Sequence, residues 1–227
     1  MTHWKVITAL LILSVTAAPA HIMAQDEAEY LMEIGPAAGG CFYMGDANSR
    51  LYRGTRLMGG AVLRYNVNPR LSVKATMTAG GISGSTFRME GRSFPDDFSF
   101  RRTIYDFGFQ VECNFLAYGT TTYNGCHRLA PYYLAGAGVT FAPEPARNDF
   151  AANFPIGIGV KYKLAPRLNA GLEFTMRFST SDRLDVTGTV GEDPLHVKSG
   201  FMKNKDSYSY TMLTLTYDIY AKPCNCN

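Results

Sequence analysis

The side chains best suited to catalysis or metal binding are few and scattered along the chain. Beyond the first 24 residues the histidines are His127 and His196, and His196 lies near Glu192 and Asp193. Such a grouping could bind a metal ion or form an Asp–His pair of the kind found in proteases. No Ser or second His is placed with it on a strand, so we interpret the segment as a solvated loop.

Two Gly-x-Gly pairs, at 136–138 and 157–159, could be read as phosphate-binding loops. A phosphate loop needs a helix whose N-terminal N–H groups face the anion, and no helical pattern follows either pair. We interpret them as glycines within strands. We therefore expect a protein that is not an enzyme and that has no cofactor, no metal site and no small-molecule substrate.

The composition narrows the class of protein. The chain has 227 residues, a formal net charge of +3, 46% hydrophobic residues and 18% charged residues. This small basic excess does not favour nucleic-acid binding. After the N-terminal segment, the longest uncharged and mostly apolar run is 129–143, which is shorter than the roughly 20 residues of a spanning helix.

The N-terminus has the pattern of a cleaved signal peptide. Lys5 precedes an apolar stretch over 6–18, and small residues follow, with cleavage expected after Ala24 or, as an alternative, after Ala20. We assign 1–24 to the signal peptide. The mature chain is then exported to an oxidising compartment, where cysteines can pair.

The mature chain shows eight segments in which apolar and polar residues alternate, which is the pattern of strands with one apolar face. They lie at about 30–43, 57–67, 71–78, 105–115, 133–141, 154–164, 168–178 and 210–219. Their number is even and their lengths suit tilted strands that cross a bilayer. We predict an eight-stranded antiparallel transmembrane β-barrel over 25–220, followed by a periplasmic tail over 221–227.

Charged residues in these segments fall on one face, and the two signs are balanced. A soluble barrel such as a lipocalin would also alternate, but the opposite face is almost free of charge and the polar face is rich in glycine. We expect a plugged lumen filled with ion pairs. Its charged residues are Glu33, Arg64, Lys74, Asp106, Glu112, Lys161, Lys163, Glu173, Arg177 and Asp218.

The connections alternate in length. Short turns are expected at 68–70 and 165–167, with one longer connection at 119–129 on the same side, and long loops are expected at 46–56, 84–101, 142–153 and 180–206. Outer-membrane barrels have short periplasmic turns and long extracellular loops. We therefore expect the bacterial outer membrane as the location, with both termini in the periplasm.

Several segments, in this order, resemble the PorG-like outer-membrane barrels. They are Glu33-Ile34-Gly35, Tyr43-Met44-Gly45-Asp46, the run from Arg64 to Arg70, Ile82-Ser83-Gly84, the run from Pro131 to Val139, Gly157-Ile158-Gly159-Val160-Lys161-Tyr162 and Leu213-Thr214-Leu215-Thr216-Tyr217. The resemblance covers about 30–220. It departs from the family in the loop 180–186, which is poorer in Asp, and in a tail that extends past the terminal aromatic residue.

The resemblance implies a structural component of the type IX protein secretion system. In that system the barrel is associated with a periplasmic ring made of an outer-membrane lipoprotein and a partner protein. The alternative is a small barrel that acts as an adhesin or envelope stabiliser through its long loops. A third hypothesis, an outer-membrane enzyme acting on lipid or peptide, has little support from the scattered polar residues.

The five cysteines are an odd number, so at least one lacks an internal partner. Cys113 and Cys126 flank the same periplasmic connection and are our candidates for an intramolecular disulfide, with Cys126 paired to a tail cysteine as the competing arrangement. Cys224 and Cys226 are too close together to bridge easily. We expect a tail thiol to link to, or dock on, a periplasmic ring component, and a tail thiol without any role is the alternative.

The partner-linking role of the tail gives a first test. On non-reducing electrophoresis of intact envelopes, we expect a larger band for the wild-type chain that is lost when Cys224→Ser and Cys226→Ser are combined. Absence of that band in the wild type, or its survival in the double variant, would show that the tail makes no covalent link.

Overall fold

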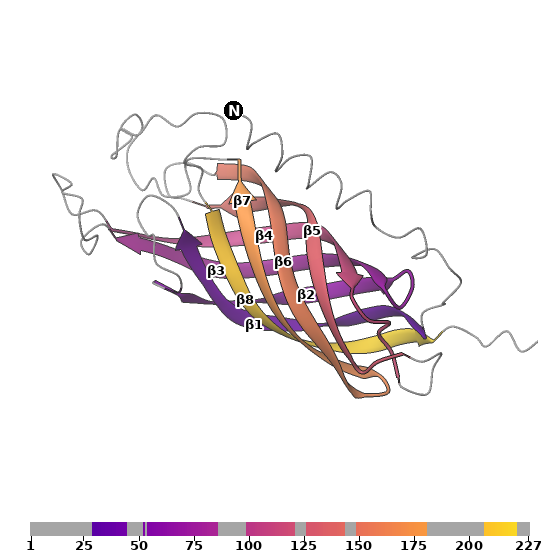
Figure 1. The fold of residues 1–227 in the computed structure, drawn as a ribbon. Helices are drawn as coiled ribbons and strands as arrows, with labels where there is room; N and C mark the ends of the chain where they lie inside the picture. The colour runs from indigo at the N-terminus through magenta and orange to yellow at the C-terminus, as the bar shows by residue number, and fades with distance from the viewer. Residues whose placement is uncertain are drawn as a thin grey trace, which may run out of the picture.

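The computed structural model describes residues 29–44, 52, 54–85, 99–120, 126–143, 149–180 and 207–221, and within them the chain forms a closed antiparallel barrel of eight strands. Each strand pairs with the next in sequence, and β8 closes the barrel against β1 (Figure 1). The strands are β1 (Tyr30–Met44), β2 (Arg56–Asn66), β3 (Leu71–Ser85), β4 (Ser99–Asn114), β5 (Leu129–Ala142), β6 (Asp149–Ala165), β7 (Leu168–Ser179) and β8 (Ser207–Ala221). The predicted fold is confirmed, while the expected signal peptide and residues 222–227 of the tail lie outside the described residues.

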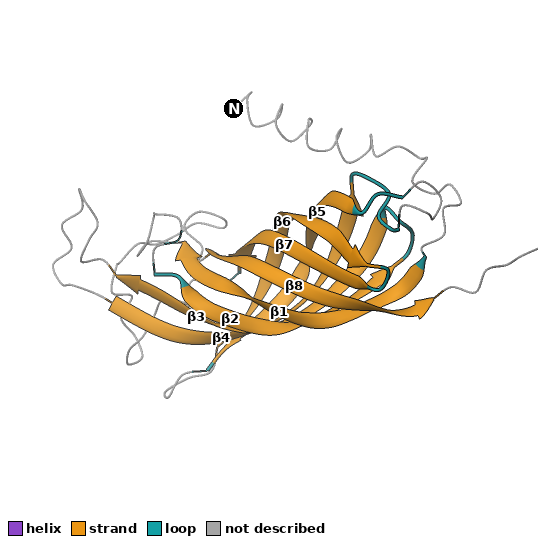
Figure 2. Ribbon diagram, turned by 90° about the horizontal axis from the view of Figure 1, so that it is seen from below, coloured by secondary structure: helices purple, strands orange, loops and turns teal. Residues whose placement is uncertain are grey.

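The two ends of the barrel differ as the sequence predicts. At one end, which we call the short-turn end, residues 67–70 join β2 to β3, Pro166 and Arg167 join β6 to β7, and the longer connection 115–128 joins β4 to β5. The Asn68 side chain holds the first turn, because its Oδ1 accepts hydrogen bonds from the N–H groups of Arg70 and Leu71 at 2.8 and 2.7 Å. The other four connections lie at the opposite, long-loop end (Figure 2).

Strands at the long-loop end run further than the sequence predicts. Two of the expected loops, 84–101 and 142–153, lie partly within strands, since Gly84 pairs with Phe100 and Ala142 pairs with Asp149. Backbone hydrogen bonds extend these ladders beyond the predicted segments. The alternation also continues there, with Ala151 and Asn153 buried and Ala152 exposed, although the two small alanines hide the pattern.

The barrel has an apolar outer surface and an interior that is mostly polar, apart from a buried hydrophobic cluster that includes Met58, Val62 and Ile104. The large apolar side chains of every strand that the structure describes stand mostly outside, for example Phe109, Ile158 and Leu213 at 56%, 64% and 63% exposure. Polar and charged side chains at the intervening positions are buried inside the barrel. In a soluble protein the apolar side chains face inward, so this arrangement is reversed, as it is in transmembrane barrels. No helix in the part of the chain that the structure describes is long and apolar enough to cross a membrane.

One outward-facing residue departs from the pattern. The sequence places Phe42 on the apolar face of the first strand, yet its side chain is fully buried. Tyr52, from the connection after β1, lies over it with ring centroids 4.8 Å apart and with its hydroxyl 3.2 Å from Thr211 Oγ1. A loop residue therefore covers the outside of the barrel at the long-loop end, which strand periodicity alone does not predict.

Glycines at inward-facing positions of the strands let the backbones of neighbouring strands approach closely. A Cβ on Gly60 of β2 would lie 2.2 Å from the carbonyl oxygen of Met77 on β3, so no larger residue fits there without moving the backbone. A Cβ on the neighbouring Gly59 has no atom nearer than the Ala37 oxygen at 3.8 Å. The two glycines are adjacent in sequence but differ in what surrounds them.

This contrast gives a matched pair of variants. We expect Gly60→Ala to lower the free energy of unfolding by about 1–3 kcal/mol, because the added methyl group forces β2 away from β3. Gly59→Ala should change it by less than about 0.5 kcal/mol. Urea unfolding in detergent micelles measures both, and equal effects of the two substitutions would contradict the close contact at Gly60.

Candidate functional site

All ten charged residues predicted for the lumen are buried inside the barrel, and each one is in an ion pair. They are Glu33, Arg64, Lys74, Asp106, Glu112, Lys161, Lys163, Glu173, Arg177 and Asp218. Because alternate residues of a strand face the same side, a charge on the polar face must point into the lumen. The sequence therefore predicts which charges point inward, and the register of the strands decides how they pair.

Glu112 on β4 is the centre of the largest network. Its carboxylate accepts hydrogen bonds from Arg64 of β2, at 2.8 Å from Nε and 3.3 Å from Nη2. The Lys74 and Lys161 ammonium groups, from β3 and β6, lie 3.0 and 2.6 Å from the same carboxylate. One anion thus contacts three cations from three different strands.

Two further carboxylates share these cations. Glu33 of β1 pairs with Arg64 and also accepts hydrogen bonds from Asn66 Nδ2 and Thr216 Oγ1, each at 2.9 Å. Glu173 of β7 pairs with Lys74. The Tyr132 hydroxyl of β5 donates to Glu173 at 2.6 Å, so all eight strands contribute a side chain to one connected network.

A second cluster lies toward the long-loop end. Asp106 of β4 pairs with Arg177 of β7 and accepts hydrogen bonds from the Tyr208 hydroxyl at 2.6 Å and from Asn153 Nδ2 at 2.8 Å. The Arg177 guanidinium also lies over the Tyr210 ring, 4.6 Å from its centroid. Thr140 Oγ1 of β5 also donates to Asp106 at 3.2 Å, so the buried carboxylate has donors from four strands.

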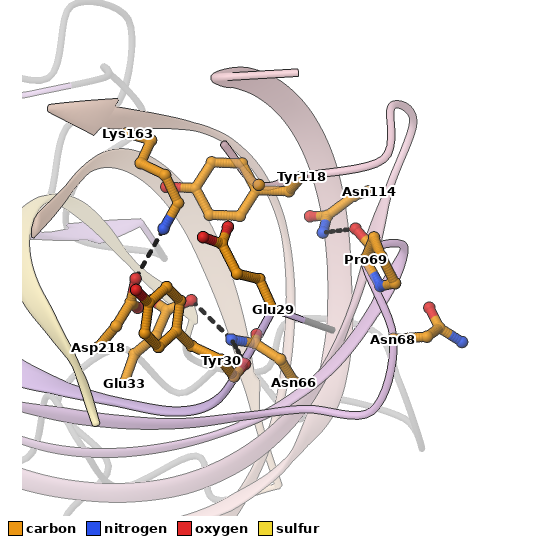
Figure 3. Close-up of a pocket in the computed structure, with 11 residues that line it drawn as sticks. Glu29, Tyr30, Glu33, Asn66, Asn68, Pro69, Asn114, Tyr118, Lys163 and Asp218 are labelled. Atoms are coloured by element: carbon orange, nitrogen blue, oxygen red, sulfur yellow. Dashed lines mark hydrogen bonds and ion pairs between the residues drawn. The ribbon is translucent and has the colours of Figure 1, made fainter. Parts of the chain in front are cut away.

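The third cluster lies at the short-turn end (Figure 3). Lys163 Nζ is 2.6 Å from Asp218 Oδ2, and Asn169 Nδ2 donates to Asp218 Oδ1 at 2.7 Å. Tyr118, from the connection between β4 and β5, folds in and donates from its hydroxyl to Asn169 Oδ1 at 2.7 Å. Burial raises the pKa of Tyr118 above its ordinary value, so the hydroxyl stays protonated and acts as a donor.

Glu173 and Arg177 illustrate why register is needed. They share one face of β7, but residues four apart on a strand are separated by about 13 Å along its axis, too far for an ion pair. In the structure Glu173 pairs with Lys74 and Arg177 pairs with Asp106, in both cases with residues from other strands.

Some residues of these clusters were missed by sequence reasoning. They are Tyr118, Tyr132, Tyr208, Asn153 and Asn169. Tyr132 lies in the run Pro131-Tyr132-Tyr133, where neither residue type nor hydrophobicity distinguishes the two faces. Its spacing from Gly136 and Thr140, which lie on the polar face of the same strand, is the signal that could have placed it inside.

The expected disulfide between Cys113 and Cys126 is not formed in the structure. Cys113 is a free thiol on the outward side of β4, between the inward-facing Glu112 and Asn114. Cys126 is buried in the connection beside Gly119. The two cysteines flank the connection in sequence, but Cys113 faces outward from β4 whereas Cys126 is buried within the connection. Cys224 and Cys226 lie outside the described residues.

The described residues hold no group of three or more His, Cys, Asp or Glu side chains that could bind a metal ion. His127 is exposed in the connection 115–128, where its N–H donates to the Ala117 carbonyl at 2.7 Å. Glu192, Asp193 and His196 lie outside the described residues.

Comparison with known proteins assigns the chain to a family. The family profile described as "Domain of unknown function (DUF6089)" matches residues 7–227. A search of curated proteins found no match.

Among solved structures, three small barrels are similar to this chain. Neisserial surface protein A is 8% identical, with 83% of this chain and 97% of that chain covered and a TM-score of 0.49. The attachment invasion locus protein Ail of Yersinia pestis is 13% identical, with 85% and 99% covered and a TM-score of 0.43. The outer membrane protein OprG of Pseudomonas aeruginosa is 10% identical, with 86% and 99% covered and a TM-score of 0.43.

The central network can be tested with a double-mutant cycle. We expect Glu112→Gln to lower the free energy of unfolding by about 3–5 kcal/mol, because three buried cations lose their shared anion. Adding Lys161→Met should recover part of that loss, since Glu112 is the carboxylate that Lys161 contacts. Unfolding in micelles measures each variant, and a double variant that loses the sum of the two single effects would show that the pair is not coupled.

Proposed function

The chain belongs to the DUF6089 family, and we propose that it is an outer-membrane component of the type IX protein secretion system. Its role in this proposal is structural: it anchors a periplasmic ring, made of a lipoprotein and a partner protein, to the outer membrane. The observation that carries the proposal is the lumen filled with ion pairs. A barrel that offers no channel for solutes can contact other molecules only through its outer surface and its two ends.

The outer surface supports placement in the outer membrane. Exposed apolar side chains surround the barrel, and tyrosines stand near the short-turn end on several strands, including Tyr65, Tyr162 and Tyr217 at 47%, 42% and 47% exposure. Tyrosine is enriched where lipid headgroups meet the hydrocarbon region. Closed barrels with an apolar outer band are the β-structures that span bacterial outer membranes.

The interior argues against transport of solutes through the barrel. The three clusters occupy the lumen from the short-turn end to the long-loop end, and their charged side chains are almost completely buried. Buried charges that are paired with each other stay in place, because removal of one partner leaves the other buried without a counter-charge.

The short-turn end is the better candidate for a periplasmic contact. It is compact, since the connection 115–128 is tied to the β2–β3 turn by a hydrogen bond from Tyr118 N–H to the Pro69 carbonyl at 2.9 Å. In the resemblance to PorG-like barrels, this is the end that faces the periplasmic ring. Both ends of the described barrel, at β1 and β8, also lie there.

Affinity purification of the tagged full chain from detergent-solubilised outer membranes tests the proposal. We expect the ring lipoprotein and its partner protein to be recovered together with the barrel. A second variant, shortened within the long loop 181–206, should recover them equally, because that loop lies at the opposite end. Recovery of no secretion component, combined with loss of surface adhesion in the shortened variant, would overturn the proposal in favour of an adhesin.

A further inference from the structure

A polar pocket opens at the short-turn end of the lumen. Its cavity volume is about 20 Å³, enough for one small group such as an ammonium. Its walls include Glu29, which precedes β1, Asn114 at the end of β4, Tyr118, Lys163 and Asp218 (Figure 3). None of the ion pairs that stabilise the centre of the barrel depends on Glu29 or Asn114.

The cation already present in this pocket is fully engaged. Lys163 Nζ donates to Asp218 Oδ2 at 2.6 Å, to Asn169 Oδ1 at 3.1 Å and to the Pro166 carbonyl at 3.4 Å. An ammonium group has three protons, and three acceptors use all of them. The charge of Lys163 is balanced by Asp218, so neither of these residues offers a free group to a ligand.

Glu29 and Asn114 differ from the rest of the lining because each has an acceptor to spare. Glu29 Oε2 accepts hydrogen bonds from Thr120 N–H at 3.0 Å and Thr120 Oγ1 at 2.9 Å, while Oε1 receives none from the described residues. No cation of the described chain pairs with Glu29. Asn114 is 7% exposed and donates from Nδ2 to the Pro69 carbonyl at 2.9 Å, which leaves its buried Oδ1 without a donor.

A buried carbonyl oxygen without a partner is costly, and a half-exposed carboxylate without a cation is available for binding. Figure 3 shows the Asn114 amide and the Glu29 carboxylate in the same pocket beside the Tyr118 ring. The two lining groups with hydrogen-bonding capacity to spare, Glu29 Oε1 and Asn114 Oδ1, are thus both acceptors. This chemistry selects a cationic donor and disfavours an anion.

We propose that this pocket binds the ammonium group of a lysine side chain from a periplasmic protein. Lysine fits better than arginine because its ammonium is a compact point charge, whereas a guanidinium needs a planar pair of acceptors. Aromatic faces already accompany cations here, since Lys163 lies 5.3 and 5.4 Å from the Tyr30 and Tyr118 ring centroids. The choice of a periplasmic protein rests on the proposed function, which directs the short-turn end to the periplasm.

The chain's own Lys222 is the competing occupant, because it follows β8 directly and β1 pairs with the end of β8 at Tyr30 and Ala221. Tyr220 has a φ of 61°, a left-handed conformation that interrupts the extended strand. Asp218 is therefore the last buried side chain of β8, and Tyr220 and Ala221 are exposed. Ala221 still pairs with Tyr30, so the end of β8 stays in the ladder, and the cross-linking experiment below distinguishes Lys222 from an external lysine.

The first experiment tests the chemistry of the pocket. The full chain in micelles is titrated with the peptide acetyl-Gly-Lys-Gly-amide, and the Thr120 amide resonance is followed by NMR. We expect saturable binding that Glu29→Gln weakens about tenfold, the effect of one charge-assisted hydrogen bond. Glu144→Gln, between β5 and β6 at the other end, should leave binding unchanged. Equal binding of the ε-acetylated peptide, or no effect of Glu29→Gln, would overturn the inference.

The second experiment identifies the source of the lysine. Intact envelopes are treated with a carbodiimide, which joins a carboxylate to an amine in contact with it, and cross-linked peptides are analysed by mass spectrometry. We expect Glu29 to be joined to a lysine of a different periplasmic protein, and Glu29→Gln to abolish that product. A cross-link from Glu29 to Lys222, or to a second copy of this chain, would overturn the inference, as would an unreacted Glu29.

These outcomes separate the inference from the proposed function. If the ring components copurify with the barrel while Glu29 forms no cross-link, the pocket inference fails and the proposed function stands. If the lysine peptide binds as expected but no ring component copurifies, the proposed function fails, while the inference that the pocket binds a lysine ammonium group stands.

Discussion

The ion pairs of Glu112 with Arg64, Lys74 and Lys161 are the interaction on which the rest of the structure depends. Most large apolar side chains of this barrel face outward, so its interior contains only a small hydrophobic cluster, which includes Met58, Val62 and Ile104. Its strands must instead be joined across an interior that excludes most water. Charges there are costly unless they are paired, and Glu112 holds three cations from β2, β3 and β6 at 2.6–3.0 Å.

The same network explains why the lumen of the barrel is filled. An interior bounded by eight strands is only wide enough for side chains, so large residues on some strands require small ones on others. Glycines such as Gly60 supply that space and let the strands approach closely. Once Arg64, Lys74 and Tyr132 fill the centre, the two ends of the barrel become the surfaces through which it can act. The pocket at Glu29 and Asn114 lies at one of these ends.

Much of this arrangement could be predicted from the sequence, because strand periodicity fixes the side on which each residue stands. That rule places all ten lumen charges correctly and predicts the short and long connections. It does not give the pairing, since partners such as Lys74 and Glu173 are 99 residues apart and meet only through the register of the closed barrel. The Cys113–Cys126 disulfide is not formed in the structure for a related reason: closeness in sequence does not show that Cys113 faces outward. Tyr118 and Tyr52 were missed because they come from connections, where no periodicity applies.

The claim that the charged network fills the lumen is tested most directly by single-channel recording of the purified full chain in planar bilayers. The account predicts no steady conductance, because Glu112 and its partners leave no continuous path for ions. Reproducible large open channels from the purified monomer would contradict it.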